Sequence, residues 1–400
     1  MSPAVLHAVT GFGYSSETFI YDRMRELDRL GWDTWVGAKW IVEDPLFDFP
    51  PPERVISPRP RDNLVRRLNP VAAGRDWWWL QRPIKKARPA LIHAHFGWTA
   101  IAAVPAAEHH GIPLVAGFHG YDATVFPRYG MDADGAGEPT RPPGVYDEVF
   151  EKAACIFATS EFIAATLREL GCAQEPVVVP SGIRLESFPY RGPRHQDRAE
   201  ELRIVFVGRL VPNKGPDVAI EAIAEIGDDA PVTLEIVGEG PMRAECEALA
   251  GSLGVAERVR FHGRQPRAAV LAALEEADVL VMPSRITASG QAEGLGNVIK
   301  EALAVGLEVA ATDNGGIPEA VPPERREELV QEGDAVALAT RLMEIRQSRA
   351  DWPERSLAGR RWVEETYDWK VVALKLDAAY RRVTGASPTP SEAATAQGST

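Results

Sequence analysis

The feature that most constrains the fold is a regular alternation, along the whole chain, of short β-type segments with longer segments of helical periodicity. Parallel strands need long crossover connections, usually helices, so this alternation predicts parallel sheets covered by helices on both faces. We expect strands at residues 4–9, 33–37, 90–94, 113–117, 155–159 and 177–179 in the first half, and at 203–207, 232–237, 259–261, 279–282 and 309–312 in the second.

The length of the chain predicts two domains, because 400 residues exceed what one compact core holds. Residues 184–201 are rich in Arg, Pro, Gly and acidic residues and lack periodicity, which predicts an interdomain linker. We expect Rossmann-like α/β domains over 1–183 and 202–368, and a helix at 369–383 that packs back on the first. Residues 384–400 are small, polar and Pro-containing, and we expect them to be disordered.

Charge, hydropathy and cysteine content exclude several classes of protein. A net charge of −13 argues against general nucleic-acid binding, which needs clustered basic residues. The sequence has no apolar run of membrane-spanning length and no signal-peptide pattern, so we expect a cytoplasmic protein. Cys155, Cys172 and Cys246 are widely spaced and odd in number, which predicts neither a disulfide framework nor a zinc knuckle.

One segment departs from the acidic average. Residues 54–88 contain ten basic and two acidic residues, a local charge of +8, and include Trp77, Trp78 and Trp79. Interfacial tryptophans beside Lys and Arg fit peripheral docking on the anionic inner face of a membrane, where lipid-linked acceptors lie. A core helix with a solvated basic face explains the same pattern, and both interpretations stay open.

The segment EGLGNVIKE carries the most informative chemistry. Glu293 and Glu301 bracket a glycine-containing turn and the start of a helix, just after the expected strand at 279–282. Ligands of open α/β sheets bind at the carboxyl ends of the strands, and amides at a helix start attract phosphate. Either glutamate alone is more often a solvated charge. The expected donor contacts here are Glu293, Gly294, Leu295, Gly296, Asn297, Val298 and Glu301.

A second segment, RIVFVGRLVPNKG at residues 203–215, ends a buried strand and then presents Arg209 and Lys214. Two cations at the carboxyl end of a strand can neutralise a diphosphate and stabilise it as it leaves. Either cation alone would be interpreted as a surface residue beside a turn. The two segments together predict a site for a phosphorylated donor.

These segments resemble the E-x7-E signature and the GR and KG positions of the retaining family-4 glycosyltransferases. The resemblance implies the glycosyltransferase-B fold, in which two Rossmann-like domains face each other across a cleft. It also implies that Arg209 and Lys214 hold the donor diphosphate, and that transfer needs neither metal nor cofactor. The partners would be a nucleotide-sugar donor and a saccharide or lipid-linked acceptor. The chain departs from the family at Gly296, where Pro is common, and at 323–334, where a Gly-rich stretch is usual.

The N-terminal half contains weaker motifs. The stretch GFGYSSETFI is similar to the start of family-4 enzymes that build exopolysaccharides, so we expect Gly13 near the donor and Ser15, Ser16 and Glu17 near the acceptor. In GFHGYD, the HG-x-D pattern resembles the acceptor-side motif of the family, in which the His lies close to the transferred sugar. It implies a reaction-centre role for His119 and an acceptor contact for Asp122.

Two further histidines, His93 and His95, are spaced as residues on one face of a strand. No third ligand is evident, so no metal site is predicted.

The predicted catalytic residues are therefore His119, Arg209, Lys214 and Glu293. The expected activity is transfer of a hexose from a nucleotide diphosphate donor to a hydroxyl group, in polysaccharide or glycoconjugate biosynthesis. Two alternatives remain on the same fold. One is another enzyme, such as an epimerase, and the other is a catalytically inactive nucleotide-sugar-binding protein.

Overall fold

The computed structural model divides the chain into two compact units. The first unit takes the described residues up to Gly182 and again from Trp369, and the second runs from Ile183 to Asp368. The residues that the structure describes are 2–14, 18–42, 44, 54–58, 77–130, 140–141, 143–193, 201–227 and 230–387.

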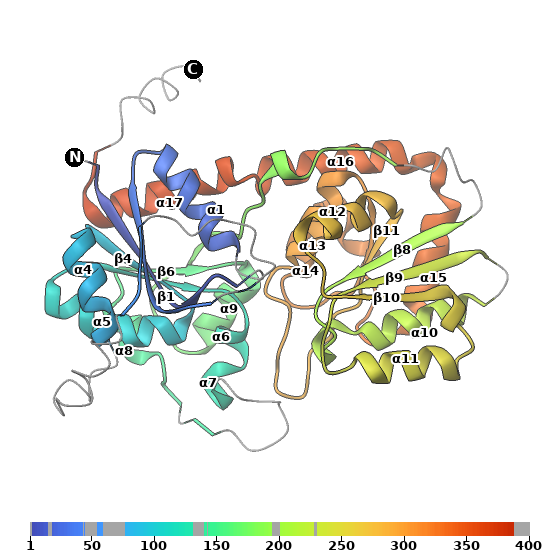
Figure 1. Cartoon of the computed structure of the whole chain (residues 1–400), viewed down its shortest axis with the longest axis horizontal. Coiled ribbons are helices and arrows are strands. Elements are labelled where there is room, and N and C mark those ends of the chain that lie inside the picture. Colours follow the sequence, from blue (N-terminus) through green and yellow to red (C-terminus); the bar gives the residue numbers. More distant parts are fainter. Residues whose placement is uncertain are drawn as a thin grey trace. The chain divides into compact units, whose positions relative to one another are not determined.

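The first unit contains a seven-stranded, all-parallel sheet with the order β3-β2-β1-β4-β5-β6-β7. Figure 1 shows α1 and α17 on one face of this sheet and α5 and α8 on the other. Its elements are β1 (Ala4–Phe12), α1 (Thr18–Arg29), β2 (Asp33–Ile41), β3 (Val55–Ile56), η2 (Trp78–Leu80), α4 (Gln81–Ala87), β4 (Leu91–His95), α5 (Gly97–His110), β5 (Leu114–Phe118), α6 (Tyr121–Thr124), α7 (Phe126–Tyr129), α8 (Asp147–Lys152), β6 (Cys155–Ala158), α9 (Glu161–Glu169), β7 (Val177–Val178) and α17 (Trp369–Thr384).

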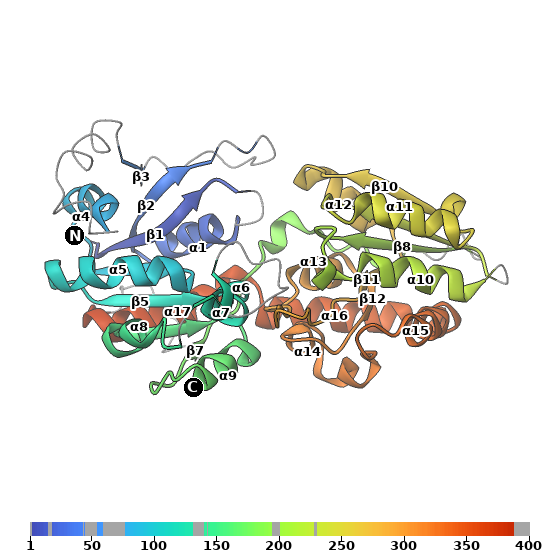
Figure 2. The ribbon, with the colours of Figure 1, turned by 90° about the horizontal axis from the view of Figure 1, so that it is seen from below.

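The second unit contains a five-stranded, all-parallel sheet with the order β10-β9-β8-β11-β12, which can be followed in Figure 2. Helices α12 and α13 lie on one face, and α10 and α11 lie on the other (Figure 1). Its elements are η3 (Leu185–Ser187), β8 (Leu202–Val207), η4 (Pro212–Lys214), α10 (Pro216–Ile226), β9 (Val232–Val237), α11 (Arg243–Ser252), η5 (Ala256–Arg258), β10 (Val259–Gly263), α12 (Arg267–Glu276), β11 (Val279–Met282), α13 (Asn297–Val305), β12 (Glu308–Ala311), α14 (Ile317–Ala320), η6 (Pro323–Glu328), α15 (Ala335–Gln347), η7 (Arg349–Asp351) and α16 (Trp352–Thr366).

The predicted fold class is confirmed, since both units are parallel α/β sheets with helices on both faces. Every residue of the central strands β4, β5 and β11 and of the edge strand β12 is buried, as expected for strands covered on both faces. The strand β3 was not predicted, because two residues are too short to show a periodicity. Strands β1 and β2 also run several residues past their predicted ends.

The helix α17 returns the end of the chain to the first unit. Its residues Trp369, Leu376 and Tyr380 are buried in one cluster with Leu91 of β4 and Phe157 of β6. This packing covers the sheet beside α1.

The segment predicted as a linker contributes to the core of the second unit. Its residues Leu185 and Phe188, together with the preceding Ile183, are buried there in one hydrophobic cluster with residues of α13. Residues 194–200 and 388–400 lie outside the described part of the chain.

The tryptophan segment contradicts the membrane-docking interpretation. Trp77 and Trp79 are 6% and 2% exposed and pack in the core of the first unit, and Trp78 packs against the same cluster. The rings of Trp77 and Trp79 are not available to a membrane surface, so the core interpretation is correct for these two residues. Residues 59–76, which carry much of the basic charge, lie outside the described residues. No helix in the described part of the chain is long and apolar enough to cross a membrane.

Candidate functional site

The loop after β8 presents the two predicted cations of the second unit. The Leu210 amide donates to the Glu239 carbonyl at 3.0 Å, and the Arg285 amide donates to the Asn213 carbonyl at 3.0 Å. These bonds tie the loop to the segments that follow β9 and β11. Within it Arg209 is exposed, whereas Lys214 is partly buried.

The structure brings Lys214 together with Glu293, from segments that lie 79 residues apart. The Lys214 ammonium donates to Oε2 of Glu293, and the two side chains are 21% and 13% exposed. Gly296 is the N-cap residue of α13, so the predicted amides of Asn297 and Val298 lie in the first turn of this helix. Glu293, which holds the ammonium of Lys214, thus lies in the segment that leads into the positive start of this helix.

A glycine turn fixes the position of Glu293. Its amide donates to Oδ1 of Asn314 at 2.9 Å, and its carbonyl accepts from the amide of Gly316 at 2.8 Å. A Cβ atom at Gly315 would lie 2.2 Å from the Glu293 carbonyl oxygen, and one at Gly316 would lie 2.2 Å from that of Gly294. Only glycine permits this backbone approach. The sequence analysis did not single out Asn314.

The remaining residues that were predicted to contact the donor differ in their exposure to solvent. Leu295 is buried, Asn297 is exposed, and Glu301 is partly buried in the second turn of α13. Arg209 has no ion pair within the described ranges. Lys214 and Glu293 are thus joined directly, whereas the predicted diphosphate contact of Arg209 stays a prediction.

In the first unit, the loop after β1 contains the predicted Gly13. Its φ is +110°, and a Cβ atom there would lie 2.4 Å from the carbonyl oxygen of Val42. Close packing against the end of β2 therefore explains this glycine without a ligand. The predicted acceptor residues Ser15, Ser16 and Glu17 lie outside the described residues.

Asp122 shapes the turn that carries His119. Its Oδ1 accepts from the amides of His119 at 2.9 Å and Gly120 at 2.8 Å, and its Oδ2 accepts from the amide of Gly97 at 2.9 Å. Burial raises the pKa of this carboxyl group, and the three amide hydrogen bonds oppose the rise. The side chain is 0% exposed. This arrangement differs from the predicted acceptor contact and makes Asp122 a residue that positions His119.

Asp122→Ala should destabilise the first unit by about 2–4 kcal/mol, because three backbone amides lose their acceptor. The measurement is the free energy of unfolding in urea. Asp147→Ala is the matched control, since Asp147 is an exposed residue of the same unit and should change stability by less than about 0.5 kcal/mol. Equal effects of the two substitutions would contradict the positioning role of Asp122.

The pair His93 and His95 has a third histidine beside it, which corrects the sequence analysis. In the parallel register of β1 and β4, His7 pairs with His93, and nitrogen atoms of all three rings lie within 4.8 Å of one another. The guanidinium of Arg23 lies 3.4 Å from Nε2 of His93 and 3.5 Å from Nδ1 of His95. These nitrogens accept from a cation, so the cluster in this arrangement does not fit a divalent metal.

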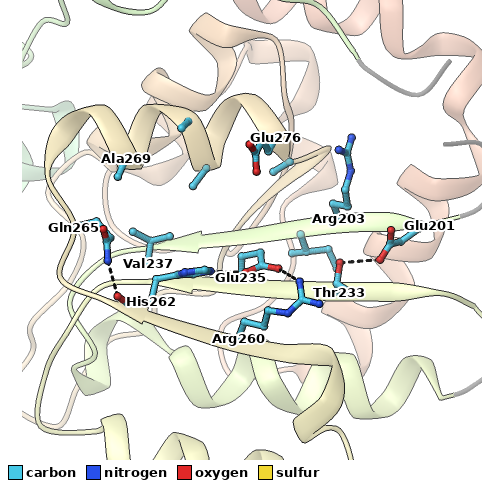
Figure 3. Close-up of a pocket in the computed structure, with 14 residues that line it drawn as sticks. Glu201, Arg203, Thr233, Glu235, Val237, Arg260, His262, Gln265, Ala269 and Glu276 are labelled. Atoms are coloured by element: carbon cyan, nitrogen blue, oxygen red, sulfur yellow. Dashed lines mark hydrogen bonds and ion pairs between the residues drawn. The ribbon is translucent and has the colours of Figure 1, made fainter. Parts of the chain in front are cut away.

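The second unit also has a cavity of about 730 Å³ between α12 and the strands β8, β9 and β10 (Figure 3). Glu235 accepts there from Arg260 at 2.8 Å and also contacts His262. The residues that line the cavity include none of the predicted donor residues. We favour the Lys214 and Glu293 site for the chemistry, because it combines a cation, a carboxylate and a helix start.

Two family models match the sequence. Glycosyltransferase Family 4 matches residues 16–187, and Glycosyl transferases group 1 matches residues 201–348. The 2-deoxystreptamine glucosyltransferase of Streptomyces kanamyceticus is 30% identical over 317 residues, which are 76% of this chain and 80% of that protein. The chain belongs to glycosyltransferase family 4. This confirms the resemblance found in the two C-terminal motifs.

Other relatives of this family-4 chain are named for exopolysaccharide biosynthesis. The amylovoran biosynthesis glycosyltransferase AmsK of Erwinia amylovora is 32% identical over 235 residues, which are 58% of this chain and 57% of that protein. The matches to the first three curated relatives span only 57–63% of those proteins.

Solved structures agree on the fold of the family-4 chain. The sucrose-phosphate synthase of Thermosynechococcus elongatus has a TM-score of 0.73 at 21% identity, over 96% of this chain and 100% of that chain. HepE of Anabaena, in complex with UDP-glucose, has a TM-score of 0.71 at 17% identity, over 95% and 99% of the two chains. The chain therefore has the glycosyltransferase-B fold.

Proposed function

We propose that this protein transfers a hexose from a nucleotide diphosphate donor to a hydroxyl group of a saccharide or lipid-linked acceptor, with retention and without a metal. The observation that carries the proposal is the contact of Lys214 with Glu293 beside the start of α13. A leaving diphosphate needs positive charge, which the ammonium and the helix amides supply.

In the proposed reaction, the bond between the anomeric carbon and the diphosphate oxygen breaks, and a bond from that carbon to the acceptor oxygen forms. The diphosphate leaves with the electron pair, and the acceptor proton passes to a phosphate oxygen. Lys214 stabilises the developing charge, with Arg209 as a second cation. Once the donor takes over Lys214, Glu293 is free to accept from sugar hydroxyls, and Glu301 accepts from the ribose.

The relatives support this choice of donor and pathway class. HepE was solved with UDP-glucose, and AmsK is named for polysaccharide biosynthesis. A GDP-mannose-dependent mannosyltransferase of Mycolicibacterium smegmatis is 35% identical over 175 residues, which are 43% of this chain and 46% of that protein. We therefore propose a nucleotide-sugar donor, most simply a UDP-hexose, in the synthesis of a polysaccharide or glycoconjugate.

A thermal-shift screen with UDP-, GDP- and ADP-sugars, followed by assay of nucleotide release, tests the proposal. A donor at 100 times its Kd should stabilise the protein by about 2.7 kcal/mol, and a Tm rise of about 5–10 °C is expected. Slow nucleotide release should accompany binding, with the sugar freed by water. Binding without release, also in the presence of saccharide acceptors, would favour the inactive binding protein. A changed sugar with no nucleotide release would favour an epimerase.

A further inference from the structure

Arg23, on α1, is a buried cation that forms no ion pair with a carboxylate of the described residues. The side chain is 2% exposed, and its polar and ring contacts in the described part of the chain are with His93, His95 and the face of Trp369. The buried Arg325 of the second unit shows the usual alternative, since it forms an ion pair with Glu308 at 2.6 Å. Isolated buried charges are costly, so a retained one points to a role other than stability.

Arg23 determines where the protons of the histidine cluster lie. A guanidinium has only donors, so Nε2 of His93 and Nδ1 of His95 must both carry lone pairs. The proton of a neutral His93 is then on Nδ1, which faces the hydroxyl of Tyr380. The proton of a neutral His95 is on Nε2.

The same logic extends to His7. Nε2 of His95 lies 3.0 Å from Nδ1 of His7, which must therefore accept. The proton of His7 is on Nε2, which has no partner among the described residues. All three rings are 0% exposed, and burial lowers their pKa values most, that of His7 to about 3. The Arg23 charge is the next cause for His7 and His93, whereas for His95 the interaction with His93 comes before that with Arg23. The cluster therefore has one consistent set of neutral tautomers.

The ring of His119 lies beside the histidine cluster, against the ring of His95. Its ring stacks on His95 with centroids 5.9 Å apart and planes 17° apart, and Phe19 and Phe96 lie against it at 4.9 and 4.8 Å. Neither ring nitrogen of His119 has a hydrogen-bond partner in the described part of the chain. Both nitrogens are buried, so the hydrogen-bonding capacity of this imidazole is unused within the described residues.

The charged and titratable groups around His119 come from several elements. Burial and then the charge of Arg23 on α1 lower the pKa of His119 to about 3. The cluster on β1 and β4 and Tyr380 on α17 are neutral, and Asp122 is bound to the backbone of the His119 turn. Among these described groups, Arg23 is thus the one with a fixed positive charge.

We propose that Arg23 is a positioning residue of the reaction centre, which holds His93 and His95 in single tautomers and places a positive charge behind His119, so that His119 meets the transferred sugar as a neutral imidazole. This inference rests on the proposed function. Positive charge develops at the anomeric carbon during transfer, and an imidazolium beside it would oppose that charge. A neutral ring can still donate to or accept from a sugar hydroxyl.

Arg23→Met tests the proposal, because methionine fills similar space without charge. We expect kcat for nucleotide release to fall about 10- to 100-fold, the cost of a misaligned reacting group. The apparent pKa of the acid limb of the pH–rate profile should rise toward the ordinary pKa of histidine. The Tm should be unchanged or higher, since a buried unpaired charge is removed. Arg23→Lys should recover part of kcat and the wild-type acid limb. Arg29→Met, on the same helix with an exposed side chain, should change none of these.

A structural role alone predicts a lower Tm with an unchanged pH profile. Wild-type kcat and an unchanged pH–rate profile in Arg23→Met would therefore overturn the proposal.

Nitrogen NMR of the wild-type protein is a second test that needs no variant. It should show protons on Nδ1 of His93 and Nε2 of His95 and a neutral His119 at pH 5. Titration of His119 near pH 6.5 would refute the inference even if donor turnover is found. Absence of turnover in the wild type would instead refute the proposed function.

Discussion

Lys214→Ala should lower the rate of nucleotide release from the donor by about 100- to 1,000-fold, the usual effect of removing one preorganised group that stabilises a leaving charge. Lys214 is held at the site before any donor arrives, because Glu293 accepts from its ammonium and the turn at residues 314–316 fixes Glu293. When the donor binds and takes over this ammonium from Glu293, the positive charge is in place before charge develops on the leaving diphosphate. The measurement is kcat for nucleotide release at saturating donor.

Two comparisons separate charge stabilisation from damage to the fold. Arg243→Ala removes a cation of α11 whose ion pairs with Glu239 and Glu247 lie on the surface, and it should leave the rate unchanged. Glu293→Gln keeps the size of the side chain, and it should lower kcat as well. Because the two groups act together, the double variant should lose less than the product of the two single effects. Wild-type turnover in Lys214→Ala would refute the assignment of Lys214.

The elements that sequence predicted well are those whose signal is local. The strands β9 and β11 match their predicted bounds, because β11 is a short apolar run and β9 alternates apolar with polar residues, each beside turn residues. The Lys214 and Glu293 site was predictable for a related reason. Both residues follow adjacent parallel strands, β8 and β11, so their loops emerge at the same sheet edge.

The features that sequence missed depend on register and on backbone geometry. His7 joins His93 only because β1 and β4 pair in one particular register, which spacing along the chain does not reveal. The sequence analysis did not single out Arg23, because a basic residue on an amphipathic helix is usually solvated. The role of Asp122 depends on three amides that converge only in the folded turn. In each case the structural sign of a role is a polar side chain that the fold buries.

Lys300→Met should raise the stability of the second unit by about 2–4 kcal/mol at pH 6, which corresponds to a Tm rise of about 5–10 °C. Lys300, on α13, is 0% exposed, and its ammonium lies 4.9 Å from the centre of the Tyr367 ring. Burial lowers its pKa to about 7, although the charge of Glu301 opposes the shift. Methionine retains the apolar stem and removes the cost of burying the charge.

The pH dependence identifies the cause of this stabilisation. Below pH 7 Lys300 is charged in the folded and the unfolded chain, so folding bears the whole cost of burying the charge. Between about pH 7 and 10.5 only the unfolded chain binds the proton, and the stability contributed by this group rises with pH. The advantage of Lys300→Met over the wild type should therefore be largest near pH 6 and shrink toward pH 10. Lys375→Met, at an exposed position, should give no such trend. A constant advantage at all pH values would mean that improved packing, not the buried charge, stabilises the variant.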